Sequence, residues 1–284
     1  MTKRPSFDRK YILAELDKLS SKIVVPTQIF IIGGLALISY GLKEATKDID
    51  VVVLSLRDLD ILVKSLTIIG YHALEDSLVS KPYEKMEVSK IMENEDGFRW
   101  DIFHRSICNK MCFSENMKPR ATEFYSRNKL VLSIASKEDI FLFKGMTERE
   151  ADLDDMRLLA ESGLDWQVIK NECVYQSNTS GRLWEDALLQ NLIDLRERYN
   201  IRSPIEKKLR KIAEEKLSED FIVKSIAAGL TTIKSISQAK NLPDYIVREY
   251  ARKMEEKGLL KFDKMSRPYK LSLVNQKLGC KVKA

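Results

Sequence analysis

The 284-residue chain lacks any apolar run of the roughly 18–20 residues that a membrane-spanning helix needs. Its first ten residues are polar and charged, without the apolar core of a secretory signal peptide. Its four cysteines include no C-x-x-C pair, and we find neither an internal repeat nor a low-complexity linker. We therefore expect a cytoplasmic protein with reduced thiols and no membrane partner.

Metal-binding side chains other than carboxylates are also scarce, since the chain has two histidines. His104, Cys108 and Cys112 are spaced as on one face of a helix, but the segment starts as a strand and no fourth ligand follows nearby. We therefore favour packed thiols over a zinc site.

The charge is unevenly distributed along the chain. The net charge is +6, yet residues 201–284 contain 20 Lys and Arg against 10 Asp and Glu, which leaves the first 200 residues at −4. A mildly acidic body with a basic C-terminal part indicates that the C-terminal part is drawn to polyanions.

The order of apolar patterns predicts an α/β (α+β) domain, a small mixed sheet flanked by helices, followed by a helical region. The expected helices are 7–20, 34–41 and 57–69, and the expected strands are 29–32, 48–54, 83–92 and 98–103, the last two joined by a hairpin turn. A helix capped by Ser136 is expected next. We divide the chain into residues 1–160, a helical extension 161–216, and a basic domain 217–284.

Two aspartates stand at the start of the second expected strand. Because strand side chains alternate between faces, Asp48 and Asp50 share one face and Ile49 points to the other. Asp101 lies in a neighbouring apolar strand and supplies a third carboxylate. Oxygen ligands of this kind suit Mg²⁺, and we expect one or two ions here. The alternatives are a solvated strand edge and a scaffold whose carboxylates are paired with lysines.

Residues around the aspartates suit a triphosphate. Gly33 and Gly34 open a helix, where backbone N–H groups can approach phosphate oxygens, although a tight turn is the plainer interpretation. Thr46 and Lys47 place a hydroxyl and an ammonium beside the carboxylates. We therefore expect an NTP as ligand.

These segments resemble the nucleotidyltransferase-fold (polymerase-beta-like) superfamily, in which Gly-Gly or Gly-Ser precedes two alternating acidic residues and a later acidic residue on a strand. Over about residues 25–160 the chain is similar to small prokaryotic nucleotidyltransferase-like proteins that include abortive-infection toxins. The matching positions are Gly33, Gly34, Ala36 and Leu37 for G-G-x-A-L, and Thr46, Asp48, Ile49 and Asp50 for T-x-D-I-D.

The resemblance implies Mg²⁺-dependent transfer of a nucleotidyl group from an NTP to a hydroxyl of an RNA, such as a tRNA end, or of a protein, in a toxin–antitoxin setting. It implies that Asp101 also assists deprotonation of the acceptor. Relatives carry a helical lysine before an acidic run, and Lys144 matches it. This lysine would neutralise the negative charge that develops during the reaction. The alternative interpretation of Lys144 is a structural lysine at the edge of a packed helix. Arg149, Asp152 and Asp155 belong to the same run, whereas we expect Asp154 to be solvated.

One position departs from the family pattern. Relatives often place an arginine two residues before the threonine, where this chain has Glu44, with Lys43 adjacent. If that arginine binds phosphate, Lys43 must substitute for it. An alternative function is therefore a DNA-binding regulator whose nucleotidyltransferase-like domain senses nucleotide or is inactive.

The basic domain has the pattern of three helices, 218–229, 231–241 and 242–258, followed by a β-hairpin, which resembles a winged helix-turn-helix domain. The third helix would enter the major groove of DNA and the hairpin would be the wing. Winged helices also dock proteins, and a solvated basic face is the default for single residues. The expected nucleic-acid-binding residues are Arg248, Arg252, Lys264 and Arg267.

Overall fold

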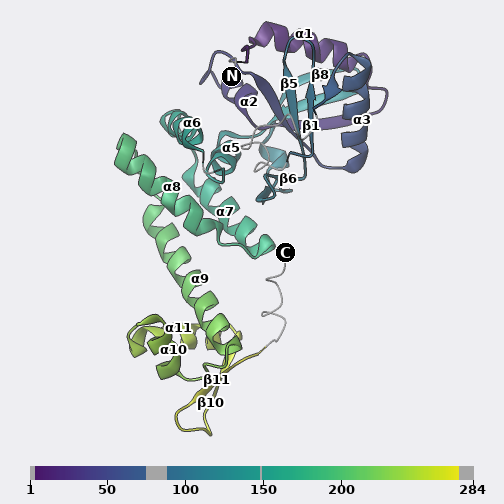
Figure 1. The fold of residues 1–284 in the computed structure, drawn as a ribbon. Coiled ribbons are helices and arrows are strands. Elements are labelled where there is room, and N and C mark those ends of the chain that lie inside the picture. Colours follow the sequence, from purple (N-terminus) through teal and green to yellow (C-terminus); the bar gives the residue numbers. More distant parts are fainter. Residues whose placement is uncertain (1–3, 75–87, 148, 275–284) are drawn as a thin grey trace. The chain divides into compact units, whose positions relative to one another are not determined.

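The computed structural model of the chain (Figure 1) describes residues 4–74, 88–147 and 149–274. It forms two compact units, which we describe separately: residues 1–176 with 190–203, and residues 177–189 with 204–284. The N-terminal part of the expected strand 83–92 lies outside the described residues. None of the described helices combines the length and apolarity needed to cross a bilayer.

The first unit is built on a mixed sheet of seven described strands, in the order β3-β4-β5-β2-β1-β9-β8. Two neighbouring pairs, β1 with β9 and β2 with β5, are parallel, and the other pairs are antiparallel. The strands are β1 (Thr27–Ile31), β2 (Asp48–Val53), β3 (His72–Ala73), β4 (Lys90–Glu93), β5 (Arg99–His104), β8 (Thr122–Arg127) and β9 (Leu130–Ile134).

Helices flank this sheet and extend the unit beyond it (Figure 1). One of them, residues 56–68, contacts β1, β2, β4 and β5 and so covers part of one sheet face. The helices are α1 (Arg9–Ser20), α2 (Gly34–Ser39), α3 (Leu56–Ile68), η2 (Lys118–Arg120), α5 (Lys137–Lys144), α6 (Glu150–Glu161), α7 (Trp166–Ser180) and α8 (Trp184–Tyr199); α7 and α8 continue into the second unit.

The turns and caps that position the site follow local sequence signals. Ser136 caps α5 by accepting a hydrogen bond from the N–H of Asp139 at 3.2 Å, as the sequence predicted. In the hairpin between β4 and β5, the N–H of Gly97 donates to the carbonyl of Asn94, so the predicted turn is confirmed. These contacts hold the ends of two elements that carry candidate site residues.

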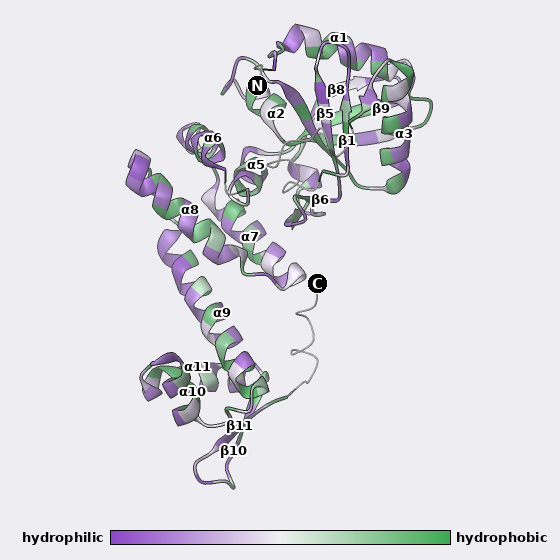
Figure 2. Cartoon of the chain, viewed as in Figure 1, coloured by the Kyte–Doolittle hydropathy of each residue, from purple (hydrophilic) through white to green (hydrophobic). Residues whose placement is uncertain are grey.

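The core of the first unit consists mainly of apolar side chains that are buried from solvent. Figure 2 shows hydrophobic residues along the strands and on the helix faces turned to them. Phe30, Ile49 and Trp100 are at most 1% exposed, and burying a side chain of this size contributes roughly 1.5–3 kcal/mol. In β2, Asp48 and Asp50 are partly exposed and Ile49 and Val51 are buried, so the predicted alternation is confirmed.

The segment with histidine and cysteines is a hairpin rather than a helix. It contains β6 (Ser106–Ile107) and β7 (Met111–Cys112), which pair in antiparallel fashion. The residues between them have left-handed backbone conformations at Cys108 and Asn109. The spacing of one helical face therefore does not apply, and Cys108 is buried while Cys112 is exposed.

The C-terminal part of the second unit consists of three helices and a hairpin around one small core. The core includes Ile222, Ile236, Val247, Met254 and Leu260, each at most 2% exposed. The expected boundary between residues 216 and 217 falls inside the first of these helices. The elements are α9 (Glu206–Ala227), α10 (Ile233–Lys240), α11 (Asp244–Glu256), β10 (Leu260–Asp263) and β11 (Lys270–Leu273).

Candidate functional site

Three carboxylates meet at one end of the two central parallel strands. Asp50 of β2 and Asp101 of β5 are direct register partners, and Asp48 lies two residues before Asp50 on the same face. All three line a cavity of about 260 Å³. The structure thus brings together the acidic residues that the sequence singled out.

The Asp50 carboxyl group is hard to ionise in this position. Burial, followed by the negative charge of Asp48, raises its pKa to about 6. The positive charges of Lys144 and Arg149 and the N–H of Gly34 act in the opposite direction. At neutral pH the carboxylate form prevails, with neighbouring cations holding its charge.

The two glycines allow the chain to pass very close to β2. A Cβ atom at Gly33 would lie 1.7 Å from Oδ2 of Asp50, and one at Gly34 would lie 2.4 Å from Oγ1 of Thr46. The N–H of Gly34 donates to Oδ2 of Asp50 at 3.4 Å. Gly34 lines the cavity and opens the six-residue helix α2, and its N–H points to the Asp50 carboxylate.

Thr46 and Lys47 also line the cavity, with different roles in the structure. Thr46 is buried, and its hydroxyl donates to the backbone carbonyl of Asp48 at 3.0 Å. Lys47 is exposed, which leaves its ammonium group accessible to a ligand. The hydroxyl of Thr46 therefore supports the start of β2, while Lys47 lies at the solvent side.

An N-terminal segment that the sequence analysis missed contacts the same carboxylates. Phe7 exchanges two backbone hydrogen bonds with Thr46, which fixes residues 4–7 beside β2. The guanidinium group of Arg4 then reaches Oδ2 of Asp48 and the carbonyl of Lys47, each at 3.0 Å. Sequence patterns could not reveal this contact, because it joins residues more than 40 positions apart.

Several side chains that line the cavity belong to a chain of ion pairs. Lys144, the last residue of α5, lies 2.7 Å from Asp152 and 2.9 Å from Asp155, and Lys43 also pairs with Asp155. Asp152 and Asp155 are three residues apart on α6 and so share one helix face. Burial opposes the charged form of Lys144, but the two carboxylates outweigh it and raise its pKa.

Positive charge therefore reaches the cavity from Lys43, Lys144 and Arg149. Arg149 precedes α6 and donates through Nε to Asp152 at 2.6 Å. Glu44, the departure from the family pattern, is exposed and does not line the cavity. Asp154 is also exposed, as expected, and accepts a hydrogen bond from Tyr199.

The donor set has the chemistry that Mg²⁺ prefers, since it consists of carboxylate oxygens. Among the described residues, no three Asp, Glu, His or Cys side chains converge as a metal-binding group in the present arrangement. Asp48 is bonded to Arg4 instead. A divalent ion bound by Asp48 and Asp50 would therefore replace the Arg4 guanidinium at Asp48.

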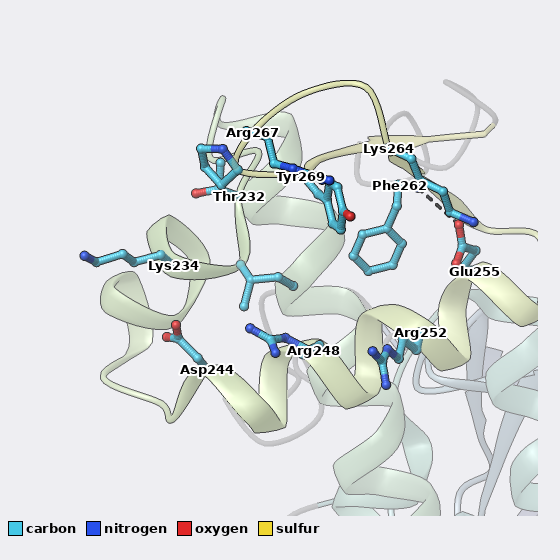
Figure 3. A pocket seen from close by; sticks show the side chains of 12 residues that line it. Thr232, Lys234, Asp244, Arg248, Arg252, Glu255, Phe262, Lys264, Arg267 and Tyr269 are labelled. Carbon is cyan, nitrogen blue, oxygen red and sulfur yellow. Dashed lines mark hydrogen bonds between the residues drawn. The ribbon is translucent and has the colours of Figure 1, made fainter.

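The four basic residues that the sequence assigned to nucleic acid share a second hollow, shown in Figure 3. Arg248 and Arg252 of α11 and Lys264 and Arg267 of the hairpin loop line a groove of about 720 Å³. The sequence analysis did not assign the other lining residues, among them Lys234 of α10 and Phe262 and Tyr269 of the hairpin. The spacing of Phe262 and Tyr269 in the sequence is ordinary, so only the folded hairpin reveals that they lie near α11.

Comparison with known proteins gives little similarity. No family model matches the chain, and no curated protein matches it. Among solved structures, a lincosamide antibiotic adenylyltransferase, LnuA, with lincomycin bound, is 16% identical, with a TM-score of 0.38; the match covers 56% of this chain and 100% of that one. A similarity this low adds no argument about fold family, substrate or activity.

Proposed function

We propose that the protein is a Mg²⁺-dependent nucleotidyltransferase that moves a nucleotidyl group from an NTP to a hydroxyl acceptor on RNA or protein. One observation carries this proposal. Asp48, Asp50 and Asp101 lie toward one end of two parallel strands and line a cavity that Lys144 and Arg149 also line. Carboxylates facing cations across a small cavity suit a metal–triphosphate complex.

The residues divide into metal-binding and phosphate-binding groups. Asp48, Asp50 and Asp101 would hold one or two Mg²⁺ ions, which neutralise phosphate charge and lower the pKa of a bound hydroxyl. Lys144 and Arg149 lie where the triphosphate charge would be offset.

The reaction needs little covalent participation from the protein. The acceptor oxygen attacks the α-phosphorus, the bond to the β-phosphate oxygen breaks, and pyrophosphate leaves. The acceptor proton passes to Asp101, which is 1% exposed and lies on the inner wall of the cavity. Gly34 and Thr46 border the same space, and the exposed ammonium group of Lys47 would orient the triphosphate.

Transfer of label from each NTP, labelled at the α-phosphate, to total RNA or to protein tests this proposal. We expect transfer that requires Mg²⁺ and is lost in Asp48→Ala and Asp50→Ala. Asp60→Ala is the matched control, because Asp60 is an exposed carboxylate on α3 that is paired with Lys64. A wild-type protein that neither transfers label nor binds any NTP would rule out the enzyme.

The groove of the second unit favours a second candidate. We propose that α10, α11 and the hairpin β10–β11 form a winged helix-turn-helix module that binds nucleic acid, with α11 as the principal contact helix. If the first unit binds NTP without transferring it, the protein is better described as a regulator that senses nucleotide. The same labelling experiment separates the two, since a regulator would show NTP binding and no labelled product.

A further inference from the structure

The groove of the second unit is a concave site rather than a flat basic face. One side of α11, which carries Asp244, Arg248, Arg252 and Glu255, forms one wall, and residues 262–269 of the hairpin form the other. Figure 3 shows the rings of Tyr269 and Phe262 between the hairpin and α11. Its volume of about 720 Å³ lies in the range of sites that enclose a ligand, roughly 300–1,000 Å³.

The cations in this groove are available for a ligand. Lys234, Arg248, Arg252, Lys264 and Arg267 are all exposed, and none forms an ion pair with a described residue. Elsewhere on the same helix the pattern is different, since Lys253 pairs with Glu249 at 2.8 Å. Five unneutralised cations gathered around one hollow favour a polyanion with several phosphates.

Aromatic rings lie among these cations. Tyr269 is 43% exposed, and the guanidinium group of Arg267 stacks over its ring at 4.3 Å. The half-buried ring of Phe262 lies beside it, on the side facing α11 (Figure 3). Exposed rings beside basic side chains are the means by which proteins stack successive unpaired bases.

Two carboxylates also line the groove, and they argue against a purely phosphate-binding surface. Glu255 accepts a hydrogen bond from the N–H of Phe262 at 3.3 Å, and Asp244 accepts one from the hydroxyl of Ser237. Phosphates avoid such groups, whereas the amino groups on base edges donate to them. A ligand with both phosphates and accessible base edges fits this mixture.

We infer that the groove binds single-stranded nucleic acid, with phosphates on the basic rim and bases against Tyr269 and Phe262. A duplex keeps the faces of its bases stacked inside, so the aromatic rings of the groove would have little to contact. A single strand offers base faces, base edges and phosphates together. This inference is independent of catalysis in the first unit.

Fluorescence anisotropy with the full-length protein tests the inference. The probes are a labelled single-stranded RNA, the single-stranded DNA of the same sequence, and the corresponding DNA duplex, each titrated across a series of salt concentrations. We expect either single strand to bind more tightly than the duplex, and comparison of the first two probes shows which sugar is preferred. Asp50→Ala should bind as the wild type does, which separates this result from any failure of nucleotidyl transfer.

Substitutions separate stacking from charge. Tyr269→Ala should weaken single-strand binding roughly five- to one-hundred-fold with little change in the salt dependence, and Tyr269→Phe should bind normally. Tyr245→Ala is its control, because Tyr245 is 69% exposed on α11 but does not line the groove. Arg252→Gln should reduce the slope of log affinity against log salt by about 0.7, unlike Lys224→Gln.

Three outcomes would overturn the inference. Tighter binding of the duplex than of either single strand would assign the groove to double-stranded DNA. Equal effects of Tyr269→Ala and Tyr245→Ala, with both proteins folded, would remove the stacking role. The absence of binding to every probe at about 50 mM salt, where phosphate contacts are strongest, would show that the groove does not bind nucleic acid.

Discussion

Substitution of Gly33 by alanine should disable the carboxylate site while leaving the fold intact. The backbone at Gly33 has a φ of −105°, outside the left-handed region, and the space around the missing Cβ is what this prediction concerns. The added Cβ would lie 1.7 Å from Oδ2, 2.4 Å from Cγ and 2.6 Å from Cβ of Asp50. Non-bonded carbon atoms need about 3.5–4.0 Å, so one side must move by more than about 1 Å.

The backbone of Asp50 cannot supply this movement easily. Its carbonyl accepts a hydrogen bond from Ile32 at 3.0 Å, and β2 is held between β1 and β5. The side chain of Asp50 must therefore turn away or the turn at Gly33 must shift. Overpacking of this kind costs about 1–3 kcal/mol of stability, which corresponds to a fall in Tm of roughly 3–10 °C.

The loss of transfer activity and of Mg²⁺ affinity should be larger than the loss of folding stability alone would cause. A displacement of about 1 Å in a catalytic group can lower the rate roughly 100-fold, and the affinity for Mg²⁺ should fall because Asp50 leaves its neighbours. Label transfer and calorimetric titration with Mg²⁺ measure the two effects at a temperature where the variant is folded. Gly145→Ala is the control, because its Cβ would meet the mobile end of Met156 at 3.2 Å.

A double-mutant cycle tests the stated cause. All three clashing atoms belong to the Asp50 side chain, so Asp50→Gly removes them. Gly33→Ala should then cost much less stability in the Asp50→Gly background than in the wild type. The same cost in both backgrounds, or full activity of the single Gly33→Ala variant, would refute the reasoning.

Three further predictions concern charges at the cavity. The Asp50 pKa of about 6 implies that the affinity for Mg²⁺, measured by titration, falls about tenfold per pH unit below 6. Between about pH 4 and 6 the folded state holds a proton that the unfolded state has lost, so the contribution of Asp50 to the free energy of unfolding should fall as the pH rises. Asp50→Asn should abolish this contribution when denaturation is measured at each pH. Arg4→Gln should tighten Mg²⁺ binding about two- to fivefold by releasing Asp48, unlike the exposed control Lys10→Gln; unchanged affinity would contradict this competition. Lys144→Met should lower the free energy of unfolding by about 1–3 kcal/mol in chemical denaturation, because each of its two buried carboxylate partners loses one cation but keeps another, Arg149 at Asp152 and Lys43 at Asp155; an unchanged free energy of unfolding would argue against that ion-pair network.

The sequence predicts those parts of the site that depend on local periodicity. Alternation along one strand places Asp48 and Asp50 on the same face, and an acidic residue in an otherwise apolar strand marks Asp101. Parallel pairing of the two strands then makes Asp50 and Asp101 direct neighbours. The capping serine at position 136 is equally local, so its prediction needed no knowledge of the fold.

Features that depend on distant contacts were not predictable. Arg4 reaches Asp48 only because Phe7 pairs with Thr46, and no spacing in the sequence indicates that pairing. The hairpin at residues 106–112 was open to a helical interpretation, since a few alternating residues fit either period. Likewise α9 begins at Glu206, well before the predicted start, because a polar helix surface gives no clear boundary.

Glu44 illustrates that one motif position does not determine the charge around the cavity. A motif is defined by positions along one segment, whereas the binding of a phosphate depends on the charges that surround it in space. Here positive charge comes from Lys43 beside that position and from Lys144 and Arg149 at the corner between α5 and α6. Asp152 pairs with both Lys144 and Arg149 and is 3% exposed, so the corner is held together by buried ion pairs. The cavity therefore retains cations opposite its carboxylates without an arginine at position 44.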